Sequence, residues 1–464
     1  MSPSANNTGE VFDVAVIGAG VVGCAIARRF TLEGARTIVL EKGHDILDGA
    51  SKSNSAILHT GFDAPPESRE ARCIQAGYQE YERIRGALNL PLDRCGALVL
   101  AWTEEQEARL PTLMQQARDN AVDDIKLLSR SETVGLEPNL ATQVRASFRV
   151  PREALIDPWS APHAYLEQAL LNGAMLKRNC AVRAGEFDGQ QWHLETSHGT
   201  IHTKFVINAA GLFGDHIDKA LLGRTDFEIR PRKGQFIVFD KTAARLSRHI
   251  PTETTKGIVV CRTIWGNLLV GPTAEEQSDR ETAELVPETL DYLHQKGIEI
   301  LPALATEDIT AFYAGLRPAS GQKEYQIRAH AGHNMITVGA IRSTGLSAAL
   351  GIAKYVFDLG QEAGLQCTPL VDPVHQPIEN MSEDLERDWQ RPGNGGIICH
   401  CERVTRREIE VAMSGPLAPN SLAGLKRRTR VTMGRCQGFY CTAALAECTK
   451  GKLTHPIAGA RHDD

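Results

Sequence analysis

The feature that most constrains this chain is a glycine-rich turn between an apolar segment and a helix near its start. Residues 12–42 read FDVAVIGAGVVGCAIARRFTLEGARTIVLEK. The apolar run Val14 to Ile17 is typical of a strand buried on both faces of a sheet. Gly18, Gly20 and Gly23 follow with the spacing G-x-G-x-x-G. This spacing permits a tight turn, the approach of backbone to a pyrophosphate, and close packing of helix on strand.

An acidic residue stands at the end of the next apolar segment. Glu41 follows the second expected strand, where a carboxylate can accept a hydrogen bond from a ribose hydroxyl. Glycines that serve packing alone would not require an acid at this point. The strand, turn, helix, second strand and acid together predict a dinucleotide site.

Length and charge narrow the class of protein. The chain has 464 residues, which predicts two or three domains, and 42% of them are hydrophobic. Its net charge of −6 offers no basic field for nucleic acid. We find no apolar run long enough for a transmembrane segment and no signal pattern at the polar N-terminus. We therefore expect a soluble, cytoplasmic protein.

Later segments repeat the pattern of a strand followed by glycine. They are KFVINAAGLFGDHI at 204–217 and MITVGAIRSTGLSAALGIAKYVFDLG at 335–360. The loop DGASKSNSAILHTGF at 48–62 is rich in small and polar residues, and its amides can face a bound anion. Since only one complete fingerprint occurs, a second NAD domain is not expected. The pattern indicates one nucleotide domain interrupted by insertions.

These segments resemble the FAD-dependent oxidoreductases of the D-amino-acid oxidase superfamily. More narrowly they are similar to flavin glycerol-3-phosphate dehydrogenases and oxidases and to the neighbouring 2-hydroxyglutarate oxidases. The resemblance is carried by GAGVVGCAIAR, NSAILHTGFD, VINAAGLFGDHI, KGIVV with GNLLVGPTAE, AGLRP and IRSTGLSAALGIAKYV. It implies an α/β fold in which a Rossmann-like FAD-binding domain (11–85, 151–225 and 330–366) is interrupted by an antiparallel-sheet substrate domain (86–150 and 226–329).

The resemblance also implies a set of residues around a non-covalently bound FAD. The expected cofactor-binding residues are Gly18, Gly20, Gly23, Glu41, Lys42, Ser51, Asn54, Ser55, Val182, Ala210, Gly211, Gly339, Ser343, Thr344, Gly345 and Leu346. Ser343 and Thr344 precede a helix, so their amides can bind an anion or the flavin edge.

His59, in NSAILHTGF, is the candidate base. Hydride transfer from an alcohol requires removal of the hydroxyl proton, and an imidazole with an ordinary pKa of about 6.5 is suited to that task. A lone histidine in a loop would otherwise serve only local hydrogen bonding, and the resemblance favours the catalytic role. An amine substrate would not need a strong base.

Basic residues are expected to bind an anionic substrate. Arg317 in GLRP and Arg342 in AIRSTGL can offer guanidinium forks to a carboxylate or phosphate, with Ser343 beside them. Lys256 stands where related glycerol-phosphate oxidases carry a substrate-binding lysine. This chain departs from the pattern at CRTIWGN (261–267), where relatives often read Ala-Pro-Thr-x-His-Gly. The departure puts the identity of the substrate in question.

Cysteines gather at the end of the chain. Cys399, Cys401, Cys436 and Cys441 have the spacing C-x-C and C-x₄-C, while Cys448 is interpreted as packing. Four thiolates can hold structural zinc or an iron–sulfur cluster, and C-x-C is unusual for zinc. Six further cysteines are scattered, as in reduced cytosolic proteins.

Thr405 and Glu408 predict a capping box for a helix that Gly415 can end.

About fifty residues near the end of the chain resemble the bacterioferritin-associated ferredoxin-like [2Fe–2S] module, on SLAGLKRRTRVTMGRCQGFYC. The same module ends the large subunit of anaerobic glycerol-3-phosphate dehydrogenase. The resemblance implies a small helical [2Fe–2S] domain at 396–450 after a linker at 367–395. A flavin that feeds such a cluster would export electrons singly to an acceptor protein or a quinone-linked partner subunit, in a hetero-oligomer peripheral at the inner membrane.

We therefore expect an FAD- and [2Fe–2S]-dependent dehydrogenase acting on the CH–OH group of a small anionic substrate, with glycerol 3-phosphate first. Hydroxy acids such as 2-hydroxyglutarate, and secondary amines or imino acids, remain alternatives. A non-enzymatic electron-transfer or redox-sensing subunit is the alternative from another class.

Overall fold

The computed structural model of the protein describes residues 10–254 and 257–457. Its largest sheet has eight strands, in the order β18-β19-β11-β1-β2-β8, with a β9–β10 hairpin joined to β11. The strands β19, β11, β1, β2 and β8 run parallel. The bounds are β1 Val11–Ile17, β2 Thr37–Leu40, β8 Met175–Lys177, β9 Val182–Phe187, β10 Trp192–Thr196, β11 Gly199–Asn208, β18 Gln326–His330 and β19 Met335–Gly339.

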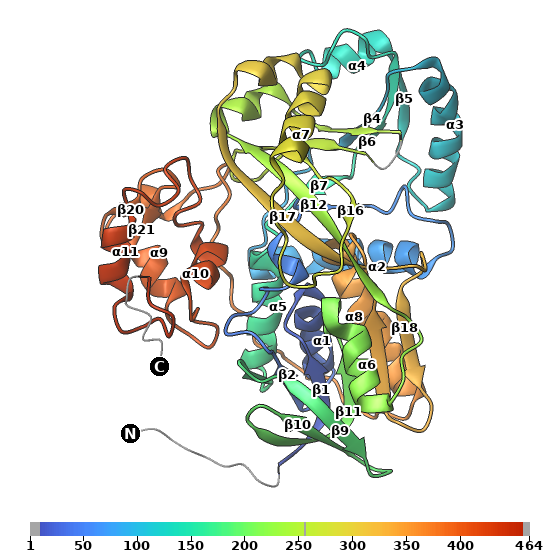
Figure 1. Cartoon of the computed structure of the whole chain (residues 1–464), viewed down its shortest axis with the longest axis vertical. Coiled ribbons are helices and arrows are strands. Elements are labelled where there is room, and N and C mark those ends of the chain that lie inside the picture. Colours follow the sequence, from blue (N-terminus) through green and yellow to red (C-terminus); the bar gives the residue numbers. More distant parts are fainter. Residues whose placement is uncertain (1–9, 255–256, 458–464) are drawn as a thin grey trace.

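Both faces of this sheet are covered (Figure 1). Val14 and Val16 of β1 belong to the core shared with the helices, and Ala15 and Ile17 to a core that includes Trp192 of the hairpin. This explains the uninterrupted apolar run in the sequence. The helices of this part are α1 Val21–Leu32, α2 Arg69–Leu88, α5 Ser160–Leu171, α6 Gly214–Leu222 and α8 Gly345–Glu362.

Two smaller sheets form the upper part of the molecule in Figure 1. The first, β13-β4-β6-β5, consists of β4 Ala97–Ala101, β5 Lys126–Ser129, β6 Ala146–Val150 and β13 Ile250–Glu253. The second, β14-β15-β12-β16 with β17 on β12, consists of β12 Ile229–Phe239, β14 Val259–Arg262, β15 Leu268–Gly271, β16 Glu275–Glu276 and β17 Ile309–Ser320. The helices here are α3 Glu104–Asp119, α4 Arg130–Leu136 and α7 Pro287–Ile300.

The expected organisation is corrected in three details. The pair β13–β4 is parallel, so the first small sheet is not wholly antiparallel. The expected boundary at 329 falls inside β18, which is hydrogen-bonded to β19 in the large sheet. Helix α2 runs past residue 85 to Leu88. The α/β fold itself, with an interrupted nucleotide-binding domain, is confirmed.

Short elements connect these parts. The strands β3 Ile57–Leu58 and β7 Ala154–Leu155 form an antiparallel pair. The 3-10 helices are η1 Ala50–Lys52, η2 Gly211–Phe213, η3 Lys241–Leu246, η4 Pro302–Thr306 and η5 Asp388–Gln390. The segment 48–62, expected as a loop, therefore contains η1 and β3.

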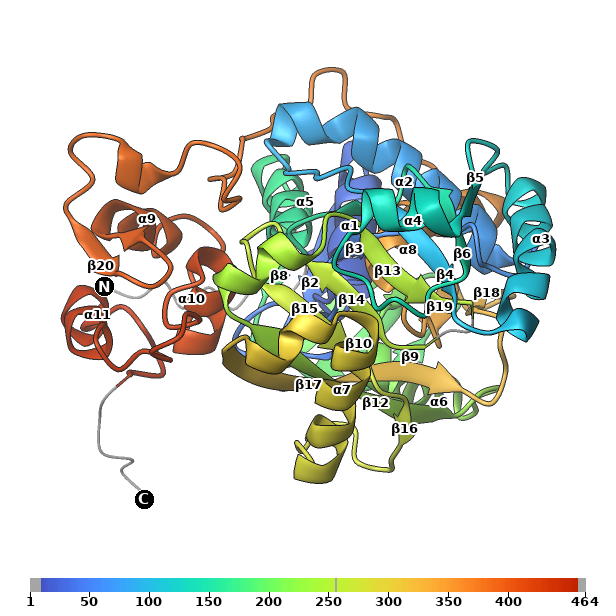
Figure 2. The same cartoon turned by 90° about the horizontal axis from the view of Figure 1, so that it is seen from above.

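A small C-terminal module stands beside the main body (Figure 2). It contains β20 Ile397–Cys399, β21 Val404–Thr405, α9 Arg406–Ala412, α10 Leu422–Thr429 and α11 Thr442–Thr449. Helix α10 lies nearest the body and α11 lies farther from it in both views. The expected capping box of Thr405 and Glu408 is present, but α9 ends at Ala412, before Gly415. The segment before the module packs along the main body. The amide of Ile378 donates to Leu88 O, and that of Glu383 donates to Ile264 O.

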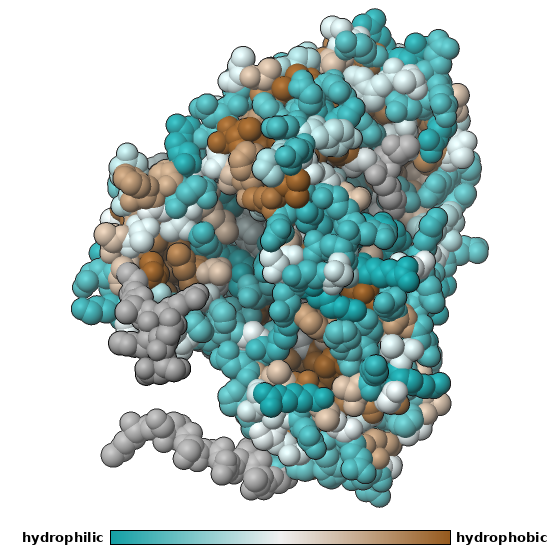
Figure 3. Space-filling view, viewed as in Figure 1, coloured by the Kyte–Doolittle hydropathy of each residue, from teal (hydrophilic) through white to brown (hydrophobic). Residues whose placement is uncertain are grey.

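The face shown in Figure 3 is mostly hydrophilic, with small separate hydrophobic patches. Among the described residues, none of the helices combines the length and apolar character needed to cross a membrane.

Candidate active site and cluster centre

The glycine turn of the large sheet leaves no room for side chains. Gly18 has φ +104°, and a Cβ there would lie 2.7 Å from Ala209 O. A Cβ on Gly23 would lie 1.9 Å from Gly18 O. These two contacts hold the first helix close against the sheet, as the spacing predicts. The backbone at this turn can therefore approach a pyrophosphate closely.

The polar groups around this turn also suit a dinucleotide. Glu41 directly follows β2, and its carboxylate accepts hydrogen bonds from Ala19 N and Gly43 N, both at 2.7 Å. Burial raises the pKa of Glu41. Its oxygens have lone pairs left for a ribose hydroxyl. No acidic residue lies in the first turn of α1, where the helix dipole favours an anion. The residues present fit FAD.

The other predicted cofactor residues are distributed around the same edge. Ser51 Oγ accepts from Val21 N at 3.0 Å, which ties η1 to the start of α1. Asn54 Oδ1 accepts from Ala56 N, and Ser55 O lies 3.8 Å from Cys261 Sγ. Lys42 is paired with Glu281 at 2.9 Å. Gly20, Val182, Ala210, Gly211, Gly339, Gly345 and Leu346 lie at the starts or ends of α1, β9, η2, β19 and α8.

His59 and Glu153 meet because of the β3–β7 register. Ile57 pairs with Leu155 and Leu58 with Ala154, so the next position in each strand faces the other. His59 Nδ1 lies 2.8 Å from Glu153 Oε2, and the glutamate side chain is 2% exposed. Glu153 Oε1 accepts from Thr60 N at 2.6 Å and from Thr60 Oγ1 at 2.8 Å. The carboxylate is thereby fixed and can hold the imidazole in one orientation.

The start of α8 lies against this pair. His59 N donates to Ser347 Oγ at 2.9 Å. Thr344, immediately before the helix, donates to Glu70 Oε1 at 2.7 Å. Arg342 has φ +60°, and its guanidinium donates to Lys323 O at 3.0 Å. This brings the predicted base to the same helix terminus that follows Arg342 and Ser343.

Arg317 lies on β17, next to Pro318, whose carbonyl oxygen accepts from Arg342 N at 3.3 Å. Its guanidinium donates to Thr273 O at 3.1 and 3.2 Å. Burial, followed by the nearby charge of Arg232, lowers the pKa of Arg317 to about 10. Because no carboxylate lies within ion-pair distance of Arg317 among the described residues, an anion can serve as its counter-charge. Lys256 lies outside the described residues.

Glu153 carries no recognisable signal in the sequence. It stands in VPREALIDP, which holds no motif, and its role depends on the pairing of two two-residue strands far apart in the chain.

The four expected cysteines are arranged in pairs. The thiols of Cys401 and Cys436 interact, as do those of Cys399 and Cys441. Burial and then the charge of Cys399 raise the pKa of Cys441 to about 12. Within residues 10–254 and 257–457, no group of three or more metal-ligating side chains is close enough to hold a metal ion. Four thiolates are the ligand set that a [2Fe–2S] cluster requires.

Backbone amides support this centre. The N–H of Tyr440 lowers the pKa of Cys436, with further contributions from the Cys401 thiol and the N–H groups of Gly438 and Phe439. A Cβ on Gly434 would lie 2.3 Å from Cys401 Cβ, so only glycine fits there. These features fit a thiolate-held cluster, whose negative charge such donors stabilise.

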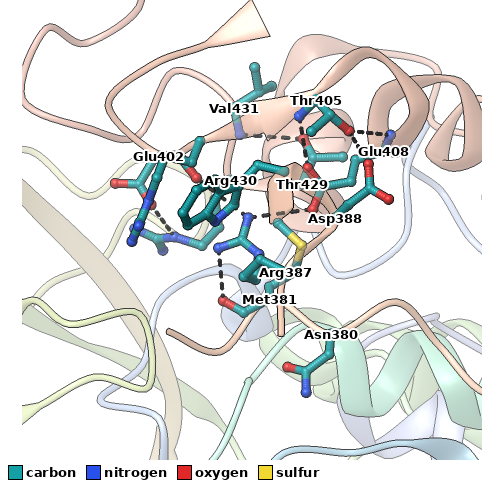
Figure 4. Close-up of polar contacts among 12 residues, drawn as sticks. Asn380, Met381, Arg387, Asp388, Glu402, Thr405, Glu408, Thr429, Arg430 and Val431 are labelled. Atoms are coloured by element: carbon teal, nitrogen blue, oxygen red, sulfur yellow. Dashed lines mark hydrogen bonds and ion pairs between the residues drawn. The ribbon is translucent and has the colours of Figure 1, made fainter. Parts of the chain in front are cut away.

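A buried polar network fixes the module (Figure 4). Arg387, 2% exposed, lies 3.4 Å from Glu408 Oε1 and donates to Met381 O. Thr405 Oγ1 donates to Asp388 Oδ2 at 2.5 Å. The network joins the segment before the module to the helix that follows Cys401, so the module is held to the chain that wraps the body.

The fold and the two centres define a redox protein that combines a flavin site and an iron–sulfur site in one chain. Residues 13–359 match the family model "FAD dependent oxidoreductase", and residues 397–448 match "BFD-like [2Fe-2S] binding domain". The chain belongs to this FAD-dependent oxidoreductase family. Its cofactors are FAD and a [2Fe–2S] cluster, which removes the zinc alternative.

Relatives match both modules. The chain is 31% identical over 455 residues to a glycerol 3-phosphate dehydrogenase from Caloramator mitchellensis, covering 96% of this chain and 95% of the relative. It is 25% identical over 496 residues to one of the subunits of anaerobic glycerol-3-phosphate dehydrogenase from Escherichia coli K12, covering 94% and 87%. The FAD-bound L-alpha-glycerophosphate oxidase from Mycoplasma pneumoniae superposes with a TM-score of 0.74 at 26% identity, over 78% of this chain and 97% of that one.

Proposed function

We propose that this protein oxidises glycerol 3-phosphate at its secondary hydroxyl and exports the electrons through its cluster. The observation that carries the proposal is the meeting of the His59–Glu153 pair with the start of α8, beside Arg342 and Arg317. In this proposal a base, anion-binding groups and a flavin site act together at this helix terminus. The similarity to glycerol 3-phosphate dehydrogenases over nearly the whole chain supports this substrate.

His59 removes the hydroxyl proton. With Glu153 accepting from Nδ1, the neutral imidazole carries its proton on Nδ1 and its lone pair on Nε2, which is the basic nitrogen. After proton transfer, the buried carboxylate stabilises the imidazolium. Bound FAD supplies the hydride acceptor. A base of this kind contributes about 10²- to 10⁴-fold to the rate.

Arg317 and Arg342 bind the phosphate, together with Lys256 and the N–H of Ser343. Arg317 suits this role because its partners are carbonyl oxygens, which leave its positive charge uncompensated. A guanidinium offers paired donors that match the geometry of phosphate oxygens.

The reducing equivalents leave through Cys399, Cys401, Cys436 and Cys441. We assign the acceptor as a separate one-electron carrier protein or a quinone-linked partner chain at the inner membrane, with this chain itself cytoplasmic. The similarity to a relative whose name describes it as one subunit of a dehydrogenase supports a partner chain.

Steady-state reduction of a dye acceptor tests the assignment. Glycerol 3-phosphate should give a much higher kcat/KM than glycerol, which lacks the anion, and than 2-hydroxyglutarate or a secondary amine. A higher value for 2-hydroxyglutarate or the amine would replace glycerol 3-phosphate with that class of substrate.

A further inference from the structure

Two stacked tryptophans connect a segment near the expected flavin site with the cluster module. The rings of Trp159, at the start of α5, and Trp265, in the turn between β14 and β15, have centroids 5.1 Å apart and planes 17° apart. Trp265 is 4% exposed. They come from distant parts of the chain. Trp159 contacts residues near the expected flavin site, and Trp265 contacts a residue of the cluster module.

Trp159 contacts the flavin side. Its Nε1 donates to Lys52 O at 3.2 Å, in η1. The neighbouring residue Ser51 accepts from Val21 N at the start of α1, where the pyrophosphate site lies. One end of the indole stack is therefore attached to η1, which is itself hydrogen-bonded to the start of α1.

Trp265 contacts the cluster side. The guanidinium of Arg430 lies over its ring, with Cζ 4.1 Å from the centroid. Arg430 Nε donates at 2.8 Å to Glu402 Oε2, and Glu402 directly follows the ligand Cys401. Trp265 is thus linked to the Cys401–Cys436 pair through Arg430 and its ion pair with Glu402.

The same pair of thiols faces the body. Arg435 and Gln437 flank Cys436, and both contact residues of the substrate domain. Arg435 Nη2 lies 2.7 Å from Asp240 Oδ2, and Gln437 Nε2 donates to Thr310 O at 3.4 Å. These contacts hold this edge of the module close to the residues around Trp265.

The two indoles are held differently. Trp159 Nε1 donates to Lys52 O, whereas Trp265 Nε1 is buried without a hydrogen-bond partner among the described residues. The ring of Trp265 contacts both the Trp159 ring and the Arg430 guanidinium.

We propose that Trp159 and Trp265, with Arg430, form the route for electrons between the flavin and the cluster. Bound FAD would supply the two-electron acceptor, taking a hydride (two electrons and a proton) from each substrate molecule. The two electrons would pass singly through the stack to the cluster and on to two equivalents of a one-electron acceptor, and the proton would be released, which would restore oxidised FAD. The indoles are unchanged at the end. The proposal rests on the proposed function only for the source of the hydride.

Anaerobic stopped-flow absorbance of the holoenzyme tests this route. In the parent protein, cluster reduction should keep pace with flavin bleaching after glycerol 3-phosphate is added. In Trp265→Leu, the flavin should bleach at the parent rate while cluster reduction lags behind it. Trp389→Leu is the matched control, because Trp389 also lies under an arginine, Arg403, and also has a buried Nε1 without a partner, but among the described residues it stacks on no other indole.

A second trigger separates this proposal from the substrate assignment. Illumination with EDTA reduces bound flavin without any substrate, and freeze-quenched electron paramagnetic resonance then reports the reduced cluster. If illumination bleaches the flavin of the parent protein but glycerol 3-phosphate does not, the assignment of the substrate fails. The electron route can still be measured, because light then supplies the electrons. Trp159→Leu provides an independent variant if Trp265→Leu does not fold.

Circular dichroism of each variant checks the geometry itself. The exciton signal of the stacked indoles should disappear in both Trp265→Leu and Trp159→Leu and persist in Trp389→Leu, with FAD and iron contents unchanged. Cluster reduction that keeps pace with the flavin in both stack variants would overturn the proposal. Equal loss of bound FAD or iron in both would also overturn it, by showing a structural role.

Discussion

The Nδ1 nitrogen of His59 lies 2.8 Å from Oε2 of Glu153, and that carboxylate is buried and further held by Thr60. The antiparallel pairing of β3 and β7 places them opposite each other. The arrangement combines a half-buried imidazole with a fixed carboxylate behind it. It makes Glu153 a positioning residue for the proposed base.

Replacing Glu153 by Gln should lower kcat with little effect on KM. The amide can present an N–H to Nδ1, which favours the tautomer with its proton on Nε2 and removes the basic nitrogen from the substrate side. We expect a loss of about 10²-fold or more, within the range of general-base effects. Rapid kinetics of flavin bleaching measure it. Glu153→Asp should recover part of the rate, and equal kcat values in parent and Gln variant would remove the positioning role.

Replacing Arg317 by Gln should raise KM for the anionic substrate. Hydrogen bonds to charged groups contribute about 1.5 to 3 kcal/mol, which corresponds to roughly ten- to a hundredfold in binding. Arg230→Gln is the control, because Arg230 is exposed on the neighbouring strand and paired with Glu228. An unchanged KM in Arg317→Gln would show that this guanidinium does not bind the substrate.

The pH dependence of KM provides a separate check on Arg317. Its pKa is lowered to about 10, mainly by burial, and a guanidinium is charged below its pKa and neutral above it. The KM of the parent should therefore rise as the pH passes through about 10, below the ordinary arginine range. The Arg317→Gln variant should lack this rise. A rise of the same size in both proteins would assign it to another group.

Replacing Cys436 by Ser should separate the two half-reactions. Flavin reduction by substrate should continue, while reduction of a one-electron acceptor protein should be lost, because the proposed ligand Cys436 would hold the cluster through which electrons are proposed to leave. Cys448→Ser serves as the control, since Cys448 is buried beside Arg406 and is not an expected ligand. Equal loss of both half-reactions in Cys436→Ser would show that the cluster serves the structure.

The buried His163 of α5 should make the protein sensitive to acid. Burial, followed by the charge of Arg428, lowers the pKa of His163 to about 3, whereas the unfolded chain protonates it near 6.5. The unfolded state thus binds more protons between these values, and the free energy of unfolding falls as the pH falls through this window. His163→Gln should remove up to about 2 kcal/mol of this loss at pH 5.

Melting temperatures measured between pH 7 and pH 5 provide the comparison for His163. The parent should lose more stability over this interval than His163→Gln. Parallel curves for the two proteins would show that another group controls the acid sensitivity.

The sequence was sufficient for the fold class, the family and both cofactors, because these depend on local signals. The glycine spacing before α1 and the cysteine spacing at the C-terminus each lie within a short stretch whose geometry follows from the residues themselves. The capping box of Thr405 and Glu408 is another local signal, and it is present.

The partners across the fold could not be found in this way. Glu153 reaches His59 through two short strands, and Trp159 reaches Trp265 from a helix start and a strand turn far apart in the chain. Such contacts depend on how domains pack, which no local pattern encodes. The catalytic and substrate-binding roles of His59, Arg317, Arg342 and Ser343 stay predictions, as does that of Lys256.

The most direct test is an anaerobic absorption and electron paramagnetic resonance experiment on the purified holoenzyme, before and after addition of glycerol 3-phosphate. Bleaching of the flavin together with the appearance of the reduced cluster's resonance is the expected result, since substrate electrons should pass from flavin to cluster. A flavin that stays oxidised in protein with intact FAD and iron would contradict the assignment of glycerol 3-phosphate as substrate.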